Sequence, residues 1–276
     1  MDISAIKTIA SHELMINVRN KWTVLFGIMF GFLALLISYF GLITEAVVGF
    51  QGFTRTSASL LNLVLYLVPI ISLAMSTLSY SSEIDSGEML FSQPVARTEI
   101  LIGKLVGLLV SVSGSTLIGF GAAGFLISAQ VGIDGLSRYL AFVGYALLLE
   151  CSFLSLGAAI AILSGTKAQA FGYSLFVWFF FVLFYDLLVM GTTFLLNERA
   201  GNRFIFVSLF GNPVDLTRVG SLMVLGDPAI FGYAGAALVK FLGGYALSNF
   251  VLISGLIIWT IVPVAVVSLI LQKHDI

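Results

Sequence analysis

The sequence EIDSGEMLFSQPVARTEILIGK occupies Glu83–Lys104 and holds an unusual share of the charge of an otherwise apolar chain. The runs that flank it, at about 60–80 and 101–127, are apolar and long enough to cross a bilayer. A short charged stretch between two such runs marks a place where the chain leaves the membrane. We therefore interpret it as a cytoplasmic connection that contacts a partner and receives force from it.

Composition places the whole chain in a membrane. Of its 276 residues 59% are hydrophobic and 10% are charged, whereas an ordinary globular domain carries about 25% charged residues. The net charge of −1 gives no indication of a nucleic-acid partner. Cys151 is the one cysteine, which excludes an intrachain disulfide and a thiolate metal site within one chain.

Six apolar runs are long enough to span, and they must be helices because lipid offers no partner to backbone polar groups. We predict an all-α membrane protein with one transmembrane domain over 1–276. The predicted spans are 23–43, 60–80, 101–127, 139–163, 171–196 and 245–271.

Residues 2–20 are predicted to form an interfacial helix. Residues at helical spacing give it one apolar face, made of Ile3, Ile6, Ala10, Leu14 and Val18. Lys and Arg are concentrated in the connections on the side of the N-terminus, which predicts that both chain ends lie in the cytoplasm.

The outer segment 197–244 contains short apolar pieces separated by Gly-Asn-Pro and Gly-Asp-Pro breakers. We expect short re-entrant or surface helices here. They form either a docking platform for a partner or a plug that packs on its own bundle.

Two acidic residues fall inside predicted spans, Glu150 in the fourth and Asp186 in the fifth. A charge there is costly when it faces lipid, so both should face the bundle interior or a subunit interface. They form a polar path or switch, or else bond to neighbouring helices. The methionines are scattered along the chain, so no metal site is expected.

A helix over 82–98 fits the need for a rigid rod between two spans. Ser81 or Ser82 caps its start, and Pro94 ends it. Arg97 and Lys104 then reach the lipid headgroups. The predicted contact residues for a partner are Glu83, Asp85, Gly87, Glu88, Met89, Leu90, Pro94 and Arg97.

The chain contains no Gly-x-x-x-x-Gly-Lys-Ser/Thr phosphate loop, and no other catalytic motif stands out. We therefore expect no enzyme activity and no cofactor in this chain.

The connection between the second and third spans resembles the first cytoplasmic connection of the ABC-2-type permeases. The resemblance lies at Glu83, Gly87, Glu88, Leu90, Pro94, Val95, Arg97, Ile100 and Lys104. Asn212, Pro213, Asp215 and Arg218 also resemble a recurring stretch of that family, and we predict that they dock a periplasmic partner. Glu88 departs from the pattern, because many relatives carry Thr there. The resemblance implies six spans, a coupling helix and a separate cytoplasmic ATPase that binds ATP and Mg²⁺.

Within that family the chain is most similar to the permeases that serve nitrous oxide reductase maturation in denitrifying bacteria, notably at 9–14 and 81–88. This similarity implies an inner-membrane homodimer, two ATPase copies and a periplasmic β-helical maturation protein. It also implies a role in assembling a copper–sulfide centre, by exporting a small species such as a sulfur compound or by transmitting motion. A generic exporter of lipid-like or drug-like molecules is the alternative.

Overall fold

The computed structural model describes residues 2–48, 52–85, 96–225 and 244–273. Within these ranges the chain is helical with short turns and has no strand. Six stretches are long and apolar enough to cross a membrane. They lie in α2 (Lys21–Val48), α3 (Gly52–Asp85), α4 (Arg97–Val131), α5 (Leu136–Leu163), the run Lys167–Leu195 and α11 (Tyr245–Lys273). The prediction of an all-α protein with six candidate spans is confirmed.

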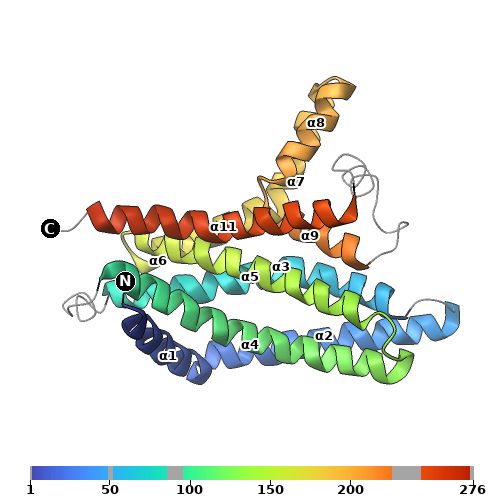
Figure 1. The fold of residues 1–276 in the computed structure, drawn as a ribbon, viewed down its shortest axis with the longest axis horizontal. Helices are drawn as coiled ribbons and strands as arrows, with labels where there is room; N and C mark the ends of the chain where they lie inside the picture. Colours follow the sequence, from blue (N-terminus) through green and yellow to red (C-terminus); the bar gives the residue numbers. More distant parts are fainter. Residues whose placement is uncertain (1, 49–51, 86–95, 226–243, 274–276) are drawn as a thin grey trace.

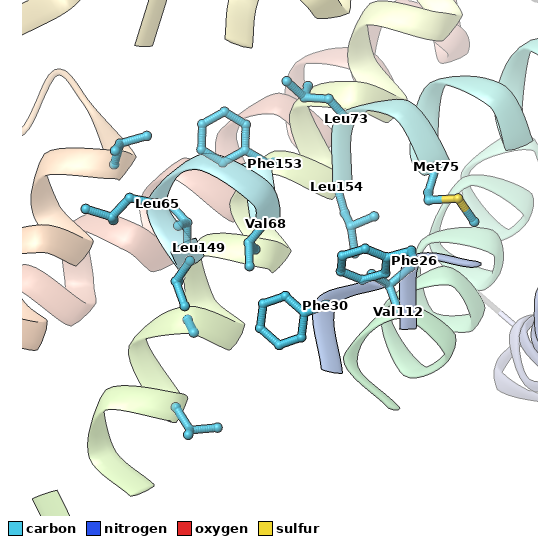
Figure 2. Close-up of a cluster of buried hydrophobic side chains, with 14 of the residues drawn as sticks. Phe26, Phe30, Leu65, Val68, Leu73, Met75, Val112, Leu149, Phe153 and Leu154 are labelled. Carbon is cyan, nitrogen blue, oxygen red and sulfur yellow. The ribbon is translucent and has the colours of Figure 1, made fainter. Parts of the chain in front are cut away.

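The long helices form one bundle, and the start of α1 and the end of α11 lie at the same end of it (Figure 1). Helix α5 is central, since it packs against α3, α4, α9 and α11. Figure 2 shows where the apolar faces of α2, α3, α4 and α5 converge. The labelled side chains there are Phe26, Phe30, Leu65, Val68, Leu73, Met75, Val112, Leu149, Phe153 and Leu154.

Helix α1 (Ile3–Arg19) is the expected N-terminal helix, and the Asp2 carboxylate caps it by accepting from the backbone N–H of Ser4. Its packed face differs from the predicted one. The buried residues are Glu13 and Asn17, whereas Ile3 and Val18 are exposed. The reason is that glycines of α4 let α1 approach closely. The side of α1 that packs against these glycines includes Glu13, at the polar edge of the apolar face of α1.

The boundary predicted at Ser81 and Ser82 is wrong, because α3 continues through both residues to Asp85. Helix α4 begins at Arg97. The coupling helix predicted over 82–98 lies mostly outside the described residues and stays a prediction.

The fifth span is interrupted. It consists of α6 (Lys167–Phe179), the π-helix η1 (Phe180–Phe184) and α7 (Tyr185–Leu195). After η1, α7 leaves the bundle and packs against α8 (Glu198–Leu209), so the pair projects from one side (Figure 1). Helix α9 (Pro213–Leu225) returns to pack on α5 and α11. These are two of the short outer helices expected before the last span. The predicted apolar piece at 229–241 lies outside the described residues.

Candidate coupling and transmission site

A buried ion pair joins α1 to α4 at the end of the bundle where α3 stops and α4 starts. Lys104 Nζ lies 3.7 Å from Glu13 Oε2, and both side chains are more than nine-tenths buried. The prediction that Lys104 reaches the lipid headgroups is therefore wrong. Glu13 gives the ammonium a partner inside the protein, so the side chain has no need to extend to the interface.

Hydrogen bonds tie this pair to α3. Glu13 Oε1 accepts from Ser79 Oγ at 2.6 Å and from Asn17 Nδ2 at 2.6 Å. Lys104 Nζ donates to the carbonyl of Ser79 at 3.2 Å and lies 5.1 Å from the ring centroid of Tyr80. One cluster thus holds α1 against the two helices that flank the predicted coupling segment.

Close backbone contact reinforces the cluster. A Cβ at Gly107 would lie 2.6 Å from the carbonyl oxygen of Ala10, and one at Gly103 would lie 2.8 Å from Ile9 Cβ. At the start of α1, the backbone N–H of Asp2 donates to Glu99 Oε1 at 2.5 Å. Helix α1 is therefore fixed to α4 along its length, and motion of the α3–α4 ends must carry α1 with it.

The predicted coupling residues are only partly described. Glu83 and Asp85 lie in the last turn of α3, and the half-buried Arg97 is the first residue of α4. The others lie outside the described residues: Gly87, Glu88, Met89, Leu90 and Pro94. The assignment of partner contacts to these residues stays a prediction.

Glu150 is fully buried in the middle of α5. Its Oε1 accepts from Ser113 Oγ at 2.5 Å, and its Oε2 accepts from Thr116 Oγ1 at 2.7 Å. Both hydroxyls lie on α4. The carboxyl group thus bonds to a neighbouring helix, which was one of the arrangements expected for an acid inside a span.

Asp186 belongs to a different network. Its Oδ2 accepts from Arg218 Nη1 at 2.8 Å, and the same guanidinium nitrogen donates to Asp215 Oδ1 at 2.8 Å. Asn212 Nδ2 donates to Asp215 Oδ2 at 3.0 Å and to the carbonyl of Phe181 at 2.9 Å. This network connects α9 to the π-helix and to the first turn of α7.

Local sequence explains how the network forms. Asn212 caps α9 by accepting from the backbone N–H of Val214 at 2.9 Å, and Pro213 suits the first helical position. The π-helix has a hydrogen-bond pattern shifted from that of the flanking α-helices, and the carbonyl of Phe181 bonds to Asn212. Asp215 and Arg218 sit one turn apart on α9, so Arg218 pairs with Asp215 and also reaches Asp186.

Burial raises the pKa of Asp215, and nearby Asp186 adds to that shift, although Arg218 opposes it. Arg218 does not cancel the effect of burial, because one guanidinium serves two carboxylates. Proton uptake at this network therefore lies within reach of ordinary pH.

The four residues predicted to dock a periplasmic partner are engaged inside the chain. Asn212 and Pro213 are buried, and Asp215 and Arg218 are partly exposed. Docking by these residues stays a prediction.

The sequence did not reveal that Asp186 pairs with Arg218, or that Glu13, Asn17 and Ser79 surround Lys104. The sequence contained only two signals of these contacts: an acidic residue inside a span, Asp186, and a lysine at the start of a span, Lys104.

The architecture is that of a six-span membrane protein whose N-terminal helix is locked to the ends of α3 and α4. Residues 7–276 match the sequence model described as "ABC-2 family transporter protein", and the chain belongs to this family. It is a multi-pass permease of the cytoplasmic membrane, and in such systems a separate subunit carries the ATPase activity.

Two curated relatives bear the name "Probable ABC transporter permease protein NosY". The one from Pseudomonas aeruginosa is 34% identical over 221 residues, which cover 78% of this chain and 80% of the relative. The one from Stutzerimonas stutzeri is 31% identical over 220 residues, with the same coverage of each chain.

Proposed function

We propose that this chain is the permease of a system that couples cytoplasmic ATP hydrolysis to assembly of the copper–sulfide centre of nitrous oxide reductase. The working unit contains two copies of the chain and two ATPase subunits, which bind ATP and Mg²⁺; the permease itself holds no cofactor. A periplasmic β-helical maturation protein docks on the outer segment 197–244. The similarity to two proteins named NosY supports the pathway.

The mechanism rests on one observation, the bond between Arg218 and Asp186. It ties α9, which packs on α5 and α11, to the first turn of α7 in the fifth span. Closure of the ATPases moves the α3–α4 ends and α1 as a unit. The same movement, carried through the bundle, shifts α9 and reaches the docked partner.

Transmission is favoured over export by Glu150, which is fully buried and is satisfied by two hydroxyls of α4. An acid that lined a cargo path would instead face a water-filled cavity. Asp186 does line a cavity of about 320 Å³ between α7 and α8, with its side chain 42% exposed, but Arg218 pairs with it there. Export of a small sulfur species remains the alternative use of the same motion.

The proposal is tested in a strain that lacks the chain, with maturation read from the copper–sulfide absorption of purified reductase. Arg218→Ala is expected to abolish maturation while ATPase binding and basal ATPase activity persist. Arg203→Ala is the matched control, because Arg203 is exposed on the neighbouring helix α8. Equal maturation in both variants would contradict transmission through Arg218.

A second experiment addresses the coupling segment. Glu88→Lys and Leu90→Asp are expected to prevent stimulation of the ATPase by the permease without unfolding the permease.

Full maturation of the reductase in a strain that lacks this permease would contradict the proposed pathway and leave a generic exporter of lipid-like or drug-like molecules as the alternative. ATP-driven sulfur uptake by inverted vesicles without the periplasmic protein would support export.

A further inference from the structure

A hollow of about 300 Å³ lies beside the buried ion pair of Lys104 and Glu13, and both residues line it. Its other walls come from α3, from the end of α1 and from the starts of α2 and α6. The volume is at the lower limit of sites that bind small molecules, so it suits a compact ligand. The hollow therefore joins the ion-pair cluster to the first residue of the fifth span.

Three hydrogen-bond donors belong to residues that line this hollow. Lys167 is the exposed first residue of α6 and forms no ion pair with a described carboxylate. Asn20 Oδ1 accepts from the backbone N–H of Trp22 at 2.9 Å, which leaves the Nδ2 group of Asn20 to donate elsewhere. Trp22 lines the hollow too, and its indole Nε1 donates to none of the described residues. The acceptor that these donors share is not part of the described chain.

The charges around the hollow do not balance. Lys104 and Lys167 contribute two cations, whereas Glu13 is the one acid among the described residues of the lining. Glu13 is already paired with Lys104, and it accepts hydrogen bonds from α1 and α3. A hollow with surplus positive charge concentrates anions from the surrounding solution.

The rest of the lining is apolar. Ile16 of α1 contributes to it, together with Met75 and Leu78 of α3. An anion that also carries a small carbon portion can set that portion against these side chains and its charged oxygens against the donors. The lining thus favours an organic anion over a bare inorganic one.

We propose that this hollow binds the phosphate group of an organic phosphate ester. The ammonium of Lys167 pairs with the phosphate, and Asn20 Nδ2 and Trp22 Nε1 donate to its oxygens. Lysine commonly binds phosphate as a point charge. Basic pockets between spanning helices on the cytoplasmic side bind anionic lipid headgroups. The ester is either a soluble compound of the cytoplasm or the headgroup of a phospholipid, since both present the same group.

A phosphate in this position links two parts of the bundle. Lys167 begins α6, whereas Asn20 follows the last residue of α1. Helix α6 is already tied to α3 by the hydroxyls of Thr77 and Ser174, which lie 2.6 Å apart. The ligand would add a link from α6 to α1, beside the ion pair. This inference concerns binding alone and does not depend on the maturation pathway.

Thermal unfolding of the full-length permease in detergent tests the site, without the ATPase, which has phosphate sites of its own. Glycerol 3-phosphate should raise the thermal midpoint of the wild type to a plateau. Lys167→Gln is expected to weaken the affinity about tenfold, because a hydrogen bond to a charged group is lost. Lys167→Arg should retain binding.

Lys21→Gln is the matched control, because Lys21 is an exposed cation next to Trp22 that does not line the hollow. It removes the same charge from the same end of the bundle and should leave the affinity unchanged. Equal weakening by Lys167→Gln and Lys21→Gln would reduce the effect to general surface attraction and overturn the proposal. Absence of any stabilisation of the wild type would overturn it as well.

Two further variants test the neutral donors. Asn20→Asp keeps an oxygen for the backbone N–H of Trp22 but replaces the donor by a negative charge, so it should abolish binding of glycerol 3-phosphate. Trp22→Phe keeps the aromatic ring, and it should weaken binding about fivefold. Asn197→Asp is the control, because Asn197 similarly caps α8 away from the hollow, by accepting from the backbone N–H of Ala200. Full affinity in both Asn20→Asp and Trp22→Phe would overturn the assignment of the phosphate to this hollow.

A lipid probe separates the two sources of the phosphate. Dihexanoyl phosphatidylglycerol presents the headgroup on chains short enough to stay soluble. Tighter binding of this lipid than of glycerol 3-phosphate would identify a phospholipid headgroup, and the reverse order would identify a soluble ester. In either case Lys167→Gln must weaken the tighter ligand. Binding of both probes that is unaffected by Lys167→Gln would overturn the proposal.

Discussion

Lys104 and Glu13 form an ion pair at 3.7 Å in which the side chains are 3% and 8% exposed. Taking two charges out of water costs several kcal/mol per ion, and the pair is tolerated because hydrogen bonds satisfy its remaining groups. Ser79 and Asn17 supply two of these bonds. The arrangement therefore specifies one position of α1 against α3 and α4, and it makes that position sensitive to the loss of either charge.

Replacing Lys104 by methionine should destabilise the permease strongly. Removing one partner of a buried pair leaves an uncompensated charge and costs about 3–5 kcal/mol. We expect a clear drop in the thermal unfolding midpoint of Lys104→Met in detergent. The double variant Glu13→Gln with Lys104→Met should recover much of that loss, because no buried charge remains. A double variant less stable than Lys104→Met would contradict this account.

The buried carboxyl of Glu150 gives a second prediction. Thr116→Val removes the hydroxyl that donates to Glu150 Oε2 at 2.7 Å, while it nearly preserves side-chain shape. An acceptor left unsatisfied in a buried place costs about 1–3 kcal/mol. Thr116→Ser keeps the donor and serves as the control. Thermal unfolding should separate the two variants, and equal midpoints would show that the bond contributes nothing.

The sequence predicted the spans well because their cause is local. A run of about 20 apolar residues must be a helix in lipid, whatever it packs against. The acid at 150 was likewise expected to avoid lipid, and it is fully buried. Gly103 and Gly107 are four residues apart, a spacing that permits close helix approach, and α1 does approach α4 there.

The contacts between distant residues could not be predicted in the same way. No local pattern pairs Glu13 with Lys104, which follows it by 91 residues and lies beside it only because α1 packs on α4. Nothing in the run at 180–184 signals a π-helix, because its partner Asn212 lies 31 residues further along the chain, just before α9. Pairing of this kind depends on how the helices pack, which a single sequence does not encode locally.

The network around Asp215 should make stability depend on pH. Burial raises the pKa of this carboxyl to about 7 from an ordinary value of 3.8, so the folded protein binds a proton that the unfolded chain has released. The resulting stabilisation is full below pH 3.8 and is lost as pH rises through about 7. We expect the thermal midpoint to fall between about pH 5 and about pH 8.

Asp215→Asn should flatten that dependence, because the amide cannot titrate. Asp134→Asn provides the control, since Asp134 is exposed in the turn between α4 and α5. The comparison uses differential scanning fluorimetry in one detergent at each pH. A pH profile that is the same in wild type and Asp215→Asn would exclude Asp215 as its source.

Gly220 gives a final prediction about the position of α9. Its backbone lies directly against the ring of Tyr145, so a Cβ there would overlap the ring. The ring cannot move freely, because Tyr145 is buried and its hydroxyl donates to Oδ1 of Asn249, on α11, at 2.9 Å. Gly220→Ala must therefore push α9 away from α5, and overpacking of this kind costs about 1–3 kcal/mol.

The control for Gly220→Ala is Gly144→Ala, because a Cβ at Gly144 meets open space. Pairing Gly220→Ala with Tyr145→Leu should restore part of the thermal midpoint. If α9 carries motion to an outer partner, Gly220→Ala should also lower reductase maturation more than basal ATPase activity. If Gly220→Ala leaves both the thermal midpoint and reductase maturation unchanged, the close contact between α9 and α5 contributes to neither.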